Sequence, residues 1–251
     1  MAKAVITEWT ADLERLLQEF RSDTSSLRKR ARKFLHAEPI QDSSGLAEVR
    51  AAVRGIYGSS ISKISSSCLH VQRAIQNQDH LSYVVFSRVL VEQTAMLFGL
   101  AHKVSILFRS DANDAMYRDV ACGFTKALLG TRFDWASFWK VGIAGMVRST
   151  QTFSPKYRQT NILTWFSKWA SMEPMVAVLY ELLCDVVHPN VGGSMLFFNV
   201  DSGKCGFVAG RASPLGDLIV WNTFKQIRRV QFLAVEILGA FRESIQIGSG
   251  I

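Results

Sequence analysis

Proline and cysteine are both scarce in this chain. Its 251 residues include five prolines, and 48% of them are hydrophobic, so the chain can bury a core and is not disordered. The four cysteines form no CxxC pair and are too few for a disulfide-stapled secreted domain: Cys68, Cys122, Cys184 and Cys205. We therefore expect a reducing, cytoplasmic setting.

A long apolar segment without charge is also missing. The longest strongly apolar stretch, Val84–Ala101, is interrupted by Arg88 and Glu92, which argues against a membrane span. The first twenty residues are unlike a signal peptide because they carry several charges, among them Glu8, Asp12, Glu14, Arg15 and Glu19. We expect no membrane partner.

The chain lacks the short motifs that hold nucleotides, activated serines or catalytic zinc. GxxxxGK[ST], GxGxxG, GxSxG and HExxH are all absent, and no acidic cluster suggests a two-metal nuclease. Cys184 and His188 offer only two zinc ligands, and no second pair has ligand spacing. We expect neither a cofactor nor a bound metal.

Basic residues outnumber acidic residues. There are 29 Lys and Arg against 21 Asp and Glu, which gives a formal net charge of +8. Such an excess favours an acidic partner, such as nucleic acid or an anionic surface, without choosing between them.

Apolar residues recur every three or four positions along most of the chain, which is typical of amphipathic helices. The expected helices cover residues 6–35 (with a weak point at Ser22–Ser26), 46–75, 81–108, 110–130 (with Ser110 as N-cap), 134–143, 162–170, 174–188 and 214–245. Residues 150–161 have no such period and predict a polar loop.

The pattern changes once, before the last helix. Residues 195–200 and 205–209 flank a turn that contains Gly203, which predicts a β-hairpin within 194–210. The fold class is therefore all-α, a bundle of seven or eight helices with a small hairpin. We expect residues 1–40 to form a basic amphipathic arm and residues 41–251 to form the bundle domain.

Aromatic residues predict a contact surface. Trp135, Trp139, Trp165 and Trp169 are a large aromatic set for one domain, which makes a homodimer or a partner interface plausible.

Arg88 and Glu92 are the only formal charges between Val84 and Ala101, and they lie four residues apart on one face of the expected helix. Burying an ion pair has a desolvation cost that the attraction and added hydrogen bonds only just offset. Two readings stay open: a structural pair that ties this helix to a neighbour, or a pocket in which Arg88 holds an anion. In either case we expect the pair to contact Tyr180 or His188.

The helix from Pro174 carries Tyr180, Cys184 and His188 at successive four-residue steps. A histidine at a helix C-terminus has its protonated form stabilised by the dipole, and Asp185 adds to this. His188 is either a functional acid or base, or a C-cap that ends the helix before Pro189.

A dense basic run lies in the first helix. Five of the six residues from position 28 to 33 are basic, namely Arg28, Lys29, Arg30, Arg32 and Lys33. On a helix they spread over the polar side, where they form either a solvated face or a ridge that contacts phosphates.

The segments Arg88-Val-Leu-Val-Glu92 and Tyr180-Glu-Leu-Leu-Cys-Asp-Val-Val-His-Pro-Asn190 resemble those of a group of prokaryotic helical proteins. That group pairs an Arg-x-x-x-Glu helix with a Tyr-x-x-Leu-(Ser/Cys)-x-x-x-His-Pro helix and is similar to HEPN (higher eukaryote and prokaryote nucleotide-binding) domains. The resemblance covers residues 45–245 in the order of elements. HEPN domains are helical and commonly dimeric, and many are metal-independent ribonucleases in toxin, phage-defence and CRISPR settings.

The resemblance implies that Arg88, Glu92, Tyr180 and His188 converge. His188 would then be the general acid or base and Arg88 would stabilise the phosphorane charge, while Tyr180 and Glu92 orient the groups. The HEPN ribonuclease motif, Arg followed four to six residues later by His, is absent at His188 because the closest upstream arginine is Arg158. We therefore expect a protein that binds nucleic acid, RNA before DNA, within a bacterial defence or nucleoprotein assembly. The alternative is a metal-independent ribonuclease.

Overall fold

The computed structural model of the chain describes residues 2–34, 45–104, 111–129, 140, 161–188, 196, 198–201, 204–207 and 214–246. Within these ranges the chain is almost entirely helical, which confirms the all-α bundle. The seven helices described are α1 (Ala2–Phe34), α2 (Gly45–Gln76), α3 (His80–Val104), α4 (Asp114–Leu129), α7 (Ile162–Ala170), α8 (Pro174–Val187) and α10 (Pro214–Gln246).

Two short antiparallel strands precede α10. They are β1 (Phe198–Asp201) and β2 (Lys204–Phe207), with Phe198 opposite Phe207 and Asp201 opposite Lys204. Most other residues of the expected hairpin, including its turn, lie outside the described ranges, so the hairpin over 194–210 as a whole stays a prediction.

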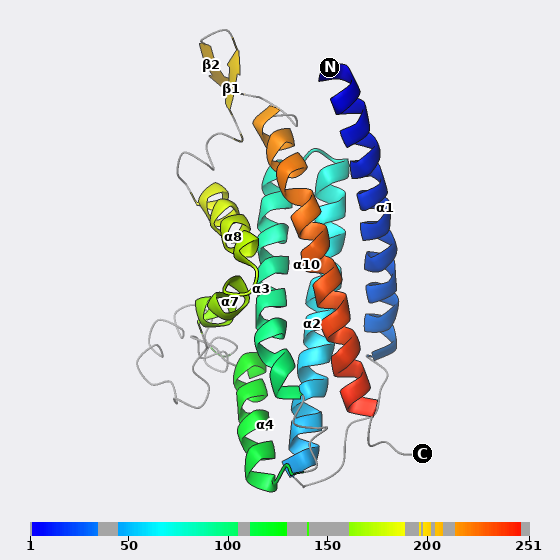
Figure 1. Cartoon of the computed structure of the whole chain (residues 1–251), viewed down its shortest axis with the longest axis vertical. Helices are drawn as coiled ribbons and strands as arrows, with labels where there is room; N and C mark the ends of the chain where they lie inside the picture. Colours follow the sequence, from blue (N-terminus) through cyan, green and yellow to red (C-terminus); the bar gives the residue numbers. More distant parts are fainter. Residues whose placement is uncertain are drawn as a thin grey trace.

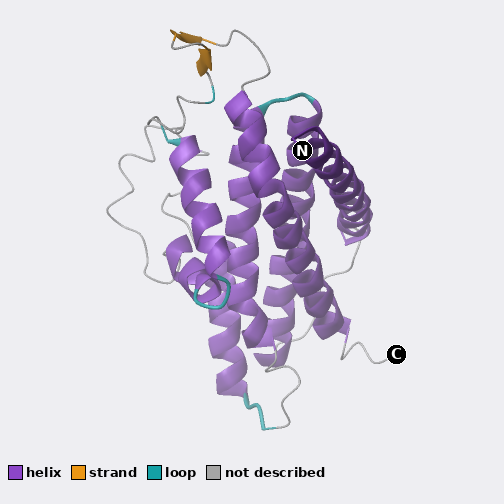
Figure 2. Cartoon of the chain, turned by 45° about the horizontal axis from the view of Figure 1, so that its top comes forward, coloured by secondary structure: helices purple, strands orange, loops and turns teal. Residues whose placement is uncertain are grey.

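Four long helices form the body of the molecule. Helices α1, α2, α3 and α10 lie side by side, and α3 packs against both α2 and α10 (Figure 1). Helix α4 packs on α2, while α7 and α8 cover the outer side of α3. In the rotated view of Figure 2 the long helices again lie together, and the two strands lie apart from them. Helix α3 is therefore the central element, as its nearly continuous apolar pattern predicts.

The burial of α3 explains its composition. Among the described helices it is the one long and apolar enough to cross a membrane, but half of its most apolar stretch is buried inside the bundle. Tyr83, Leu90 and Leu97 are fully buried along it. A core helix surrounded by neighbours needs apolar residues on most of its sides.

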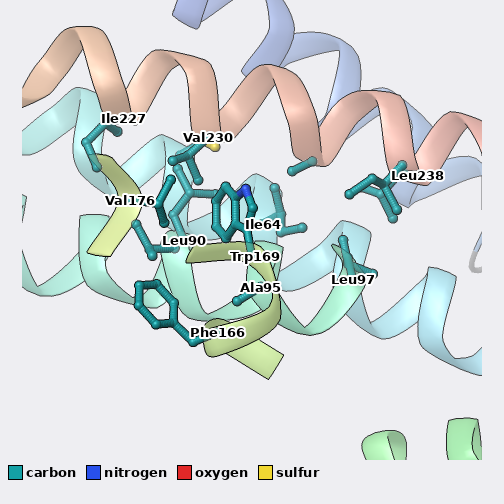
Figure 3. Packing of buried hydrophobic residues seen from close by; sticks show 14 of the residues in the cluster. Ile64, Leu90, Ala95, Leu97, Phe166, Trp169, Val176, Ile227, Val230 and Leu238 are labelled. Carbon is teal, nitrogen blue, oxygen red and sulfur yellow. The ribbon is translucent and has the colours of Figure 1, made fainter. Parts of the chain in front are cut away.

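Trp169 belongs to the core, so its assignment to an aromatic surface is wrong. Its side chain is 4% exposed, and its ring stacks on Phe98 with 6.0 Å between centroids. In Figure 3 its indole lies among apolar side chains of α3, α8 and α10. Trp165 is half-buried and packs so closely on α3 that a Cβ at Gly99 would overlap its ring. Trp135 and Trp139 lie outside the described residues.

Helix α1 is continuous through Ser22–Ser26, so the predicted weak point is wrong. The reason is tertiary. The fully buried Gln231 of α10 donates hydrogen bonds to the Phe20 carbonyl and to Thr24 Oγ1, both at 3.0 Å. These bonds and the burial of Leu27 anchor the middle of α1 in the bundle. The division into an arm over 1–40 and a domain over 41–251 stays a prediction.

Helix α4 begins later than expected. The Asn113 side chain accepts a hydrogen bond from the backbone N–H of Met116 at 3.1 Å, so Asn113 is the N-cap residue and Ser110 is not. Along its length Val120 and Phe124 point into the core, as predicted. The segments 105–108, 134–139 and 150–160 lie outside the described residues, and with them the predicted end of the third helix, most of a further helix and a loop.

Candidate functional site

Arg88 and Glu92 form the ion pair that their spacing predicts. Arg88 Nε donates to Glu92 Oε1 at 2.9 Å, one helical turn along α3. Their side chains are 27% and 26% exposed, so the pair lies at the rim of the core rather than deep inside it. This position reduces the desolvation cost of the two charges.

Tyr180 of α8 completes a three-residue cluster. Its hydroxyl donates to the same Oε1 atom of Glu92 at 3.0 Å, and the Arg88 guanidinium carbon lies 5.7 Å from the centre of the Tyr180 ring. The ring also packs against Phe166 of α7, with 4.5 Å between centroids. The expected contact between the ion pair and the α8 helix is thereby confirmed, and α3, α7 and α8 meet at this point.

The cluster holds its groups in fixed protonation states. Burial, the charge of Glu92 and its hydrogen bond raise the pKa of Tyr180 to about 12, because each disfavours the phenolate. Burial lowers the pKa of Arg88, but the bond to Glu92 and its charge outweigh this, so the pKa of Arg88 is raised overall. At neutral pH Arg88 is therefore a cation and Tyr180 a protonated phenol.

His188 does not join this cluster. It is the exposed C-cap residue of α8, and its backbone N–H donates to the Cys184 carbonyl at 3.1 Å. Eight residues separate it from Tyr180, about 12 Å along the helix. Its backbone is extended (ψ 151°), as a residue before proline requires, so the helix ends where the C-cap reading places it. Among the described residues no contact of its imidazole is recorded.

The basic run occupies the outer face of α1. Arg28, Lys29, Arg32 and Lys33 are exposed, and Arg30 is half-buried. Arg28 and Arg32 form one row along the helix and Lys29 and Lys33 form a second, because residues four apart lie one above the other. We call these five residues the basic face.

The basic face has no acidic partner in the part of the chain that the structure describes. Residues 24–33 include no Asp or Glu, and the nearest acid before them, Asp23, pairs with Arg228 of α10 at 2.9 Å. The structure records no ion pair for the five cations among the described residues. The charges of the four exposed cations are therefore directed to solvent.

The chain matches no known protein family, curated protein or solved structure at a significant level. Within the described ranges no three His, Cys, Asp or Glu side chains gather as metal ligands would.

One polar pair was not anticipated from the sequence. His80, at the start of α3, is 8% exposed, and its Nε2 atom lies 2.9 Å from Asp217 Oδ1 at the start of α10. Gly216 allows this approach, because a Cβ there would overlap the imidazole. The partners are far apart in the sequence and share no pattern, so only the fold identifies them. The pair joins two helix N-termini and is structural.

Proposed function

We propose that this protein binds nucleic acid, RNA before DNA, through the basic face of α1, as a component of a nucleoprotein assembly. The observation that carries the proposal is a run of five cations on one helix with no acidic partner among the described residues. Basic side chains that neutralise phosphates release the counterions bound to the nucleic acid. This release gives affinity without sequence selectivity. The net charge of +8 supports the same partner.

The polar cluster of α3 and α8 favours binding over catalysis. Glu92 Oε1 already accepts hydrogen bonds from Arg88 and Tyr180, and a phenol with a pKa of about 12 is a poor base at neutral pH. His188, the histidine that the proposed catalytic set would use as acid or base, lies about two turns of helix away from Tyr180. A HEPN-like ribonuclease that uses these four residues is the second candidate. What supports it is the convergence of Arg88 with Tyr180.

The first experiment separates binding through the basic face from general attraction to a basic protein. One variant reverses four exposed cations of α1 (Arg28→Glu, Lys29→Glu, Arg32→Glu and Lys33→Glu). The matched control reverses four exposed cations on other helices (Lys63→Glu, Arg73→Glu, Lys225→Glu and Arg229→Glu). With labelled single-stranded RNA, we expect the first variant to lose at least about 100-fold in affinity and the control to lose several-fold. Affinity should also fall steeply as salt rises.

The same experiment, run in EDTA, tests the ribonuclease. Intact RNA throughout, with binding lost only in the α1 variant, supports the binding protein. Cleavage that disappears in His188→Ala while folding and binding persist would replace it with the ribonuclease. If neither variant changes anything and the wild-type protein binds no nucleic acid, both functions are rejected.

A further inference from the structure

The seam between α1 and α10 changes its electrostatic character along its length. The two helices run in the same direction and pack against each other (Figure 1). Where Arg228 approaches α1, opposite charges meet: Arg228 of α10 lies 2.9 Å from Asp23 and 3.7 Å from Glu19 of α1. Its side chain is only 14% exposed, so this part of the seam is closed by matched charges.

Beyond this pair, toward the C-terminal ends of both helices (the lower seam), the described charged residues that face the seam are cations. Arg30 lies seven residues, or two helical turns, after Asp23 and therefore on the same side of α1, facing α10. Arg242 lies fourteen residues after Arg228, just under four turns, and therefore faces α1. With about 1.5 Å of rise per residue, Arg30 lies about 10 Å and Arg242 about 21 Å beyond the Asp23–Arg228 pair, so both side chains emerge from the same part of the seam, near the ends of their helices. Like charges repel here, where opposite charges attract above.

The charges of both arginines act on one buried tyrosine of α2. Tyr57 of α2 is 4% exposed, and burial raises its pKa, while the charges of Arg242 and Arg30 both act to lower it. Two cations on different helices therefore act on one phenol. Arg54, half-buried one turn before Tyr57 on the same face of α2, adds to the basic residues at this end.

The described carboxylates nearest Arg242 along α10 are turned away from the seam. Glu243 follows Arg242 directly, about 100° further around the helix, and Glu236 lies about 120° from it. Both glutamates are exposed. Within the described residues neither Arg30 nor Arg242 has a recorded ion pair. An anion from outside the chain is the group that would relieve the repulsion between them.

We propose that Arg30 and Arg242 form a phosphate-binding notch in the lower seam, which receives one backbone phosphate of the nucleic acid strand that lies along the basic face. This inference rests on the proposed function and deepens it. Arg28, Lys29, Arg32 and Lys33 supply attraction along the strand, while the notch fixes its position, because two guanidinium groups from separate helices converge on one phosphate. Arg242 thus becomes part of the interface, although it lies more than two hundred residues from the basic run in the sequence.

The test compares single neutral substitutions of equal charge. Arg30→Gln and Arg242→Gln each remove one guanidinium from the notch, and Lys225→Gln removes one exposed cation from the upper half of α10. We expect each notch variant to weaken binding of a single-stranded RNA about tenfold and the control less than about threefold. The slope of log affinity against log salt should become shallower by about 0.7 for one lost phosphate contact. A second arm measures the rise in Tm of each protein with inorganic tripolyphosphate, and circular dichroism checks that each variant is folded.

The two arms separate the notch from the proposed function. If wild-type protein binds RNA and the notch variants behave like Lys225→Gln, the notch is rejected and the proposed function stands. If no RNA binds but tripolyphosphate stabilises the wild type and not Arg242→Gln, the notch takes free phosphate and nucleic-acid binding is rejected. If neither RNA nor tripolyphosphate has an effect on wild-type protein, both proposals fail.

Discussion

The polar cluster of α3 and α8 and the basic face of α1 use arginine in opposite ways. Arg88 is held by Glu92 and lies over the Tyr180 ring, so the protein itself satisfies it. Four of the five cations of the basic face are exposed to solvent, and no acidic partner is recorded for any of the five in the described part of the chain. A charge satisfied internally contributes to folding, while an unsatisfied exposed charge is available to a partner. The difference separates a cluster that stabilises the fold from the surface that we propose binds nucleic acid.

The largest expected effect on stability comes from a substitution in the polar cluster of α3 and α8. Glu92→Ala leaves Arg88 partly buried without its carboxylate and removes the acceptor of the Tyr180 hydroxyl. We expect the free energy of unfolding to fall by about 2 kcal/mol, measured by urea denaturation. Glu181→Ala, at an exposed position of α8, is the control and should change stability by less than about 0.5 kcal/mol. Equal stability of the two variants would show that the cluster is not structural.

A smaller effect comes from Tyr180→Phe, which removes one hydrogen bond but keeps the packing. We expect a loss of about 1 kcal/mol at neutral pH. The variant should also change the response to alkali. An unfolded tyrosine ionises near its ordinary value of 10.0, whereas folded Tyr180 has a pKa of about 12. The folded state therefore retains a proton that the unfolded state loses, and stability falls as pH rises through this window.

Urea denaturation at about pH 9 and about pH 11.5 measures this change, because the two conditions bracket most of the window. Wild-type protein should lose up to about 2 kcal/mol more than Tyr180→Phe over this interval. The other tyrosines are common to both proteins and cancel in the difference. Identical pH dependence of the two proteins would contradict the hydrogen bond between Tyr180 and Glu92.

The smallest effect on stability is expected for substitutions in the basic face of α1. Arg28→Gln with Lys29→Gln removes two exposed charges that precede the last turn of α1. We expect the free energy of unfolding to change by less than about 0.5 kcal/mol, while RNA affinity falls about tenfold at low salt. A stability loss as large as that of Glu92→Ala would show that the basic face stabilises the folded protein. The difference between the two regions would then be contradicted.

Several elements could be predicted from local pattern. Pro174 at the first helical position and Pro189 after the last fix the bounds of α8, and the structure places that helix at Pro174–Val187. Apolar periodicity located α2 and the core position of α3. The four-residue spacing of Arg88 and Glu92 predicted their bond. In each case the physical cause lies within a few residues of the chain.

Other features depended on contacts between distant residues. Whether Glu92 met Tyr180 or His188 could not be read from α8, since both residues lie on related positions of the same helix. Trp169 looked like a surface aromatic because a nine-residue helix does not indicate which of its faces is covered. The serine-rich part of α1 looked weak because its hydrogen-bond partner, Gln231, comes from the other end of the chain.

The sequence by itself therefore determined the helices, the bounds of α8 and the basic face, because periodicity, proline geometry and charge spacing act over one or two turns. The tertiary structure decided which charges are satisfied. It placed Tyr180 on Glu92 and joined Arg228 to Asp23. Side-chain hydrogen bonds and ion pairs act over about 3–4 Å, and only the packing of whole helices brings distant residues that close.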